Sequence, residues 1–179
     1  AISFLIEYDG LSFVEAVNEL ANAAGLKVPN EDFSEKKNIN ESYRLEEAMK
    51  IADNFYQAQL RKSPKAINYL KTRGLTGEIA KEFSIGYAPE GWQNLQVAFK
   101  KYEDQTLVDA GLIQKNEQGR YYDRFRDRIM FPIHNAKGIV IGFGGRIINP
   151  EDTPKYYNSP ETPLFQKSYE LYGLLAARK

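Results

Sequence analysis

Positively charged side chains that could contact phosphates alternate along residues 124–128. If this segment is a strand, the alternation predicts that Arg124, Arg126 and Arg128 project from one face. Guanidinium groups match the geometry of phosphate oxygens, so such a row could follow a nucleic-acid backbone. The alternative is an edge strand whose arginines pair with the neighbouring aspartates. Composition alone favours that alternative.

A second group of polar and aromatic side chains lies in the proline-rich stretch Thr153–Pro160. It brings together Lys155, Tyr156, Tyr157 and Asn158. Interleaved basic and aromatic residues suit single-stranded nucleic acid or a nucleotide, because stacking is worth roughly 1–3 kcal/mol per base. Tyrosines that simply cover the core are an equally good explanation.

Three glycines precede Arg146 in the segment Gly142–Arg146, directly after an apolar run. Glycines in a strand mark a bulge or the close approach of another group, and an arginine beside such a gap would suit a phosphate. The spacing is not that of a dinucleotide-binding loop. The residues alone favour a structural bulge.

Composition excludes several classes of site. The 179 residues contain no cysteine and one histidine, which excludes a disulfide scaffold, a thiolate zinc site and a histidine-rich metal site. His134 and Trp92 are expected to have structural roles, Trp92 as a helix anchor in the core. The sequence has no run of about 18 apolar residues, so no membrane span is predicted. A reducing cytoplasm is consistent with the absence of cysteine.

Charge is distributed unevenly although the formal net charge is +0. Residues 1–47 hold four basic and ten acidic side chains, whereas residues 120–179 hold ten basic and six acidic ones. Separated charge of this kind can mark a surface for a partner. It directs attention to the basic end of the chain.

These residues must be positioned by helices and strands, and the periodicity of the sequence predicts an α+β fold. Its first half would be helical and would be followed by an antiparallel or mixed sheet. Ile2–Tyr8 is expected to form a strand, and the stretch after Asn149 a long loop. Residues 28–40 lack periodicity and predict a linker at a domain boundary. Helices are expected over residues 13–24, 41–62, 64–73, 76–83 and 92–100, and hairpins over 112–122 and 128–148.

Eight segments in order resemble bacterial DnaG-type DNA primases, and together they cover nearly the whole chain. They are Leu11–Val17, Tyr69–Leu75, Phe83–Pro89, Tyr122–Ile133, Ile141–Arg146, Thr153–Tyr156, Asn158–Thr162 and Leu171–Gly173.

The resemblance implies a larger protein with a zinc-binding domain, an RNA polymerase domain and a C-terminal helicase-binding domain. Residues 1–27 would be the final strand and helix of the zinc-binding domain, 28–40 the linker, and 41–179 the N-terminal subdomain of the RNA polymerase domain. The zinc ligands would lie upstream, and the acidic Mg²⁺-binding residues of the Toprim subdomain downstream. No catalytic residue and no metal site is therefore expected in this segment.

The activity implied for the whole protein is synthesis of short RNA primers from nucleoside triphosphates on a single-stranded DNA template. Its setting would be the replication fork in the bacterial cytoplasm, with the replicative helicase as a partner. The segment alone is expected to be inactive. An alternative is a non-catalytic module that binds single-stranded nucleic acid or another partner on a primase-like scaffold.

The resemblance also implies roles for individual residues. Arg73 matches a position for template handling, and the basic row becomes a candidate for phosphate contact. The residues after the glycines and in the proline-rich stretch match positions that face the active centre and the incoming nucleotide or primer. The full set of implied contact residues is Arg73, Arg124, Arg126, Arg146, Lys155, Tyr156, Asn158 and Lys167.

Overall fold

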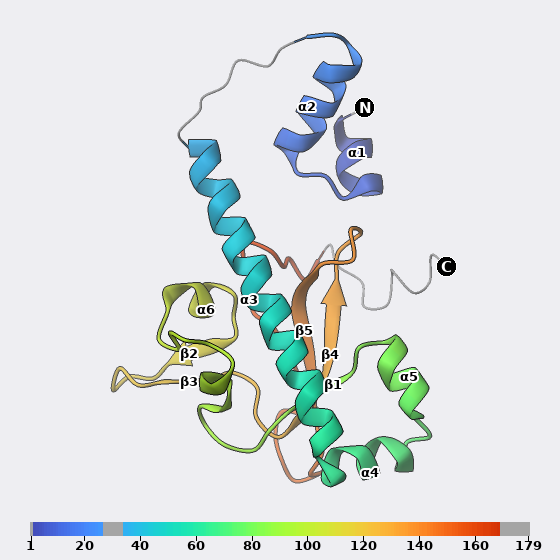
Figure 1. Cartoon of the computed structure of the whole chain (residues 1–179), viewed down its shortest axis with the longest axis vertical. Helices are drawn as coiled ribbons and strands as arrows, with labels where there is room; N and C mark the ends of the chain where they lie inside the picture. Colours follow the sequence, from blue (N-terminus) through green and yellow to red (C-terminus); the bar gives the residue numbers. More distant parts are fainter. Residues whose placement is uncertain (1, 27–33, 169–179) are drawn as a thin grey trace.

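A computed structural model describes residues 2–26 and 34–168 of the chain. Helices occupy most of the first half, and five of the six strands described lie in the second, which confirms the α+β class (Figure 1). The helical elements are α1 (Ile2–Asp9), α2 (Phe13–Ala23), α3 (Ser34–Lys62), α4 (Pro64–Thr72), α5 (Gly77–Glu82), the 3-10 helix η1 (Asn94–Val97) and α6 (Gln105–Asp109). The strands are β1 (Gly86–Ala88), β2 (Ile113–Lys115), β3 (Tyr121–Asp123), β4 (Arg128–His134), β5 (Val140–Ile147) and β6 (Tyr156–Asn158).

The main sheet has the strand order β1-β4-β5-β6 and is antiparallel throughout, while β2 and β3 form a separate hairpin. Its register decides which side chains share a face. Arg146 of β5 is opposite Ile129 of β4 and Tyr156 of β6, so these three residues point the same way. Arg128 and Tyr157 are each one position away and therefore point to the opposite face.

The long helix α3 packs across the face that carries Arg128 (Figure 1). Tyr56 of α3 is buried and meets Phe143 of β5 edge-on, with ring centroids 5.3 Å apart. A Cβ atom on Gly86 of β1 would lie 2.6 Å from the Cβ of Tyr56, so only glycine allows this approach. The main core is therefore the layer between α3 and the sheet.

A smaller core lies under α4 and α5, on the other face of the sheet. Leu70 of α4 packs there with Tyr87 and Ile129. The start of α4 is fixed as predicted, because the Ser63 hydroxyl accepts a hydrogen bond from the amide of Ala66. Helix α4 is thus held rigidly beside the sheet.

Ile2–Tyr8 forms helix α1 and not the predicted strand. A short apolar run fits either structure, and here helical spacing prevails. The rings of Phe4 and Tyr8, four residues apart, stack with centroids 5.0 Å apart, and Leu5 and Ile6 lie on the less exposed side.

Helix α3 begins at Ser34, inside the stretch predicted to be a linker. Glutamate and lysine are strong helix formers, so the helix extends through residues 34–40 without needing an apolar stripe. Residues 28–33 of that predicted linker lie outside the described residues, as does the segment Leu171–Gly173. The assignment of 28–40 to a domain boundary stays a prediction.

Two further differences concern the second half of the chain. The helix predicted over 92–100 is only the short η1, because Asp123 of β3 forms hydrogen bonds with backbone groups of this segment. Its amide donates to the Trp92 carbonyl at 2.7 Å, and its carboxylate accepts from the Leu95 amide at 3.1 Å. The predicted loop after Asn149 contains strand β6, which pairs with β5.

Candidate nucleic-acid interface

The three arginines of residues 124–128 do not lie on one strand. Strand β3 ends at Asp123 and β4 begins at Arg128, and between them Asp127 has a left-handed backbone with φ of 48°. That conformation interrupts the alternation on which the strand prediction depended. The prediction of one strand face is wrong, yet all three guanidinium groups still converge on one cavity.

This arginine cavity has a volume of about 420 Å³. Its walls come from the β3–β4 connection, the turn before η1, strand β2 and the stretch leading into β6. The lining residues are Glu90, Gly91, Trp92, Gln114, Arg124, Arg126, Asp127, Arg128, Asp152, Thr153, Pro154 and Tyr157. Three arginines, three acidic residues and two large aromatic rings therefore surround a space of suitable size for part of a nucleotide chain.

Trp92 forms one wall of the cavity and is not the predicted core anchor. Its side chain is 65% exposed. The guanidinium carbon of Arg126 lies 4.0 Å from the centroid of its indole ring, and Tyr122 meets the ring edge-on. An Arg126 nitrogen also donates to the Asp123 carbonyl at 3.2 Å. The indole ring is thus held at the surface by a cation.

Tyr157 forms another part of the wall, next to Arg124 and Arg128. Their guanidinium carbons lie 4.4 Å and 5.6 Å from its ring centroid. Burial lowers the pKa of both arginines, although each stays charged. Arg128 donates to the Pro154 carbonyl at 2.8 Å, and Arg124 donates more weakly to that of Asn158. The Nε of Arg124 is buried without a hydrogen-bond partner in the part of the chain that the structure describes.

A second group, the Arg146 cluster, lies on the other face of the sheet. Arg146 donates from Nε to the Tyr69 hydroxyl at 2.7 Å and from a terminal nitrogen to the Tyr156 hydroxyl. The bond to Tyr69 raises the pKa of Arg146. Arg73 and Lys155 lie over the rings of Tyr69 and Tyr156, at 5.5 Å and 5.9 Å from the centroids. Arg73, Arg146, Lys155 and Tyr156 are therefore brought together.

The sequence allowed the tyrosines of β6 either to bind nucleic acid or to cover the core, and the structure assigns one position to each tyrosine. Tyr157 packs edge-on against the buried Phe125, with centroids 5.9 Å apart, and so covers the core. Tyr156 is 58% exposed and belongs to the Arg146 cluster. Strand alternation sends the neighbours to opposite faces.

Gly144 and Gly145, directly before Arg146, allow close approach of other groups, and a bulge lies beside Gly142. A Cβ atom on Gly145 would lie 3.0 Å from both Arg128 Cδ and Phe125 Cδ1, and one on Gly144 would lie 3.2 Å from the side-chain oxygen of Asn158. The pairing of β4 with β5 shifts where Ile133 is opposite Gly142 and His134 is opposite Val140, so Ile141 is the extra residue. The predicted bulge therefore lies beside the first glycine, and the absence of side chains at Gly144 and Gly145 lets β6 and the arginine segment pack closely.

The remaining predicted residue, Lys167, is exposed after the last strand. Its amide donates to the Glu161 carboxylate at 3.2 Å. Among residues 34–168, no hydrogen bond, ion pair or cation–π interaction joins Lys167 to the arginine cavity or to the Arg146 cluster. Sequence reasoning omitted Trp92 and Tyr69 from the site, and it named Tyr157 in the proline-rich group but not among the implied contact residues. The signal for Trp92 is its place directly after Gly91, and the signal for Tyr69 is its place four residues before Arg73.

Within the described residues, no helix is long and apolar enough to cross a membrane. The same residues contain no group of three or more His, Cys, Asp or Glu side chains that could hold a metal ion. They therefore do not fit either of the ions that the resemblance implies for the whole protein.

The fold and the site define an α+β domain with a cationic, aromatic surface of the kind that binds nucleic acid. Residues 55–178 match the family described as DNA primase catalytic core, N-terminal domain. The chain belongs to this family. The match agrees with the expected resemblance, and the comparisons favour a primase segment over a non-catalytic module.

Similar proteins include the DNA primase of Pseudomonas putida, 46% identical over 187 residues that cover 100% of this chain and 28% of that protein. The DNA primase of Escherichia coli K12 is 47% identical over 185 residues, again covering 100% of this chain and 32% of the relative. The chain thus spans about a third or less of the length of these relatives.

Solved structures agree with the family. A DnaG primase catalytic domain bound to single-stranded DNA has a TM-score of 0.73 and 46% identity, covering 78% of this chain and 46% of that chain. The zinc-binding and RNA polymerase domains of the Aquifex aeolicus primase give a TM-score of 0.69 and 34% identity, covering 98% of this chain and 42% of that chain.

Proposed function

We propose that residues 41–179 are the N-terminal subdomain of the RNA polymerase domain of a DNA primase. Residues 1–27 would end its zinc-binding domain, and 28–40 would link the two. The whole protein would synthesise short RNA primers on single-stranded DNA during replication. The observation that carries the proposal is the arginine cavity, in which three guanidinium groups and two aromatic rings face one space.

The arginine cavity would hold the DNA template. Trp92 offers an exposed ring face for a base, and Arg124 and Arg126 supply positive charge beside it. Stacking is sequence-tolerant because every base has a π face, which suits a protein that must copy varied templates. The DnaG catalytic domain with a similar fold is a complex with single-stranded DNA, which supports this assignment.

The Arg146 cluster would contact the incoming nucleotide or the RNA primer. Arg146 is held by two tyrosine hydroxyls, so its charge is fixed in position before a phosphate arrives. Lys155 lies directly before β6 and Asn158 at its end, and both would belong to the same site as Arg146. Arg73 adds positive charge from the end of α4. Lys167 would extend this basic surface. The two groups on opposite faces of the sheet would then contact different strands of nucleic acid.

The chemistry would be completed by parts of the protein outside this chain. Mg²⁺ held by acidic residues of a Toprim subdomain would support nucleotidyl transfer, with zinc in an upstream domain and the replicative helicase bound by a C-terminal domain. This segment would bind and orient template, primer and nucleoside triphosphates, and it would be inactive alone. The setting would be the primosome in the bacterial cytoplasm.

The test uses the full-length primase and measures primer synthesis on single-stranded DNA. Arg146→Glu and Lys155→Glu should each abolish synthesis. Thermal unfolding should be unchanged for Lys155→Glu, because that side chain is exposed, and the Arg146 variant should stay folded but lose stability with its hydrogen bonds to Tyr69 and Tyr156. Lys81→Glu on α5 reverses the same charge at an exposed position away from both groups and should have little effect. Normal synthesis by the Arg146 and Lys155 variants would overturn the site assignment.

A further inference from the structure

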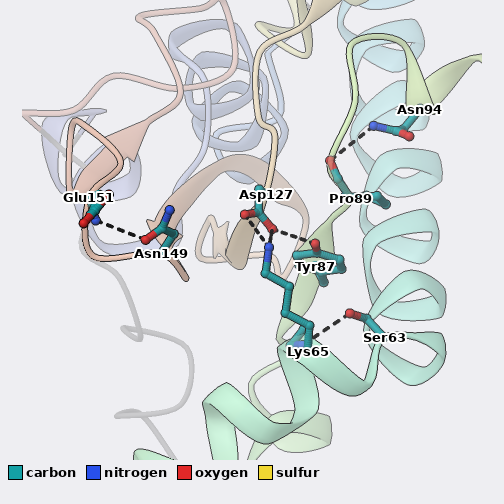
Figure 2. Close-up of polar contacts among 9 residues, drawn as sticks. Ser63, Lys65, Tyr87, Pro89, Asn94, Asp127, Asn149 and Glu151 are labelled. Carbon is teal, nitrogen blue, oxygen red and sulfur yellow. Dashed lines mark hydrogen bonds and ion pairs between the residues drawn. The ribbon is translucent and has the colours of Figure 1, made fainter.

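An acidic residue lies between two arginines of the proposed template site. The side chain of Asp127 is only 16% exposed, and its carboxylate accepts two hydrogen bonds from the Lys65 ammonium, at 2.8 Å and 2.7 Å. The same carboxylate accepts a hydrogen bond from the Tyr87 hydroxyl at 2.7 Å (Figure 2). Asp127 therefore joins the arginine segment to α4 and β1 at once.

The backbone of Asp127 is fixed as firmly as its side chain. Its φ of 48° lies in the left-handed region, and its amide donates to the Pro89 carbonyl at 3.2 Å. A non-glycine residue in this region needs surrounding contacts to hold it there. These contacts determine the direction in which the chain leaves Arg126 and enters Arg128.

Simple electrostatics disfavours a carboxylate at this place. Asp127 lines the arginine cavity, where its negative charge would repel a phosphate. Its partner Lys65 is at the start of α4, and the same helix carries Tyr69, which holds Arg146 on the other face. Helix α4 thus reaches the arginine segment through Lys65 in its first turn and the Arg146 cluster through Tyr69 one turn further on.

We propose that Asp127 and Lys65 are a positioning pair, whose ion pair fixes the arginine segment on α4 so that Arg126 lies over Trp92. Neither residue acts by touching the nucleic acid. The pair sets the shape of the template site, and α4 holds that site in a constant relation to the Arg146 cluster. This inference rests on the proposed template role of the cavity.

Asp127→Asn tests the proposal, because a role in charge alone and a role in positioning predict opposite changes in the affinity for single-stranded DNA. Asparagine tolerates the left-handed backbone and can still accept from Tyr87, but it loses the ion pair. If charge alone matters, removal of a carboxylate should strengthen binding of single-stranded DNA. If the pair positions Arg126, the variant should bind a fluorescein-labelled oligo-dT about two- to five-fold more weakly, as expected for one misplaced cation–π contact.

Trp92 supplies a second readout, because it is the only tryptophan of the chain. Its emission and its quenching by acrylamide report the guanidinium above the ring without any DNA. Asp127→Asn and Lys65→Ala should both increase quenching, and Lys65→Arg, which can keep the ion pair, should restore it. Lys81→Ala is the matched control on α5 and should leave both emission and binding unchanged.

The outcomes separate this inference from the proposed function. Weaker binding with altered Trp92 emission supports the positioning pair, and binding equal to or tighter than that of the unmodified chain overturns it. If the unmodified chain fails to bind oligo-dT, the proposed template role fails. In that case Trp92 emission alone tests the positioning pair. Altered emission in both Asp127→Asn and Lys65→Ala supports the pair, and unchanged emission overturns it.

Discussion

Replacement of Trp92 by alanine should weaken binding of single-stranded DNA strongly while leaving the fold nearly intact. Trp92 is 65% exposed, and among the described residues its ring interactions are with Arg126 and Tyr122. Loss of the cation–π contact therefore costs about 0.5–1 kcal/mol, a small part of a typical unfolding free energy. Loss of a stacking surface costs about 1–3 kcal/mol, which corresponds to a Kd about 5- to 150-fold higher.

The assay is fluorescence anisotropy of a labelled oligo-dT at fixed ionic strength, with urea unfolding measured on the same samples. Trp92→Phe keeps an aromatic face and should stay within about three-fold of the unmodified chain. If Trp92→Ala binds as tightly as the unmodified chain, the indole is not a stacking surface. If it unfolds at much lower urea, Trp92 is a core residue after all, and the reasoning from exposure fails.

Three further predictions concern stability and salt. Gly86→Ala should lower the free energy of unfolding by about 1–3 kcal/mol in urea, because the new Cβ would meet Tyr56 at 2.6 Å; an unchanged midpoint would contradict this packing. Burial raises the pKa of Asp53 to about 6, so the folded chain keeps a proton that the unfolded chain loses, and stability should fall as pH rises from about 4 to 6. Asp53→Asn can still accept from Gln57 and should reduce this fall, with a gain of about 1–2 kcal/mol at neutral pH by urea unfolding. Burial also raises the pKa of Asp123, so some of the fall should stay, and a pH dependence equal to that of the unmodified chain would refute the assignment. Arg124→Ala should reduce the slope of log Kd against log salt for oligo-dT by about one, and an unchanged slope would show that Arg124 contacts no phosphate.

Local signals in the sequence were sufficient for several elements of the fold. The capping box of Ser12 and Glu15 starts α2 as predicted, and Ser63 with Pro64 starts α4. Each of these signals acts within one turn of helix, so no distant contact can easily change its meaning. The apolar run at Ile2–Tyr8 has no such signal, and its helical form could not be distinguished from a strand by periodicity.

The site was predicted in residue type but not in arrangement. Alternation in residues 124–128 indicated one strand face, but Asp127 adopts a left-handed backbone because Lys65 and Tyr87, both distant in sequence, hold its carboxylate. Trp92 is exposed because Asp123 fixes the backbone around it. Contacts of this range are properties of the folded chain, and no local pattern carries them.

The central claim is that the arginine cavity binds the template, and photo-cross-linking tests it most directly. Oligo-dT containing 5-bromodeoxyuridine would be irradiated with the chain, and the linked peptides located by mass spectrometry. Cross-links should concentrate on Trp92 and Tyr157, and high salt should abolish them because phosphate contacts with the arginines are lost. Cross-links confined to α1, α2 or α5, with none at the two cavity aromatics, would contradict the account.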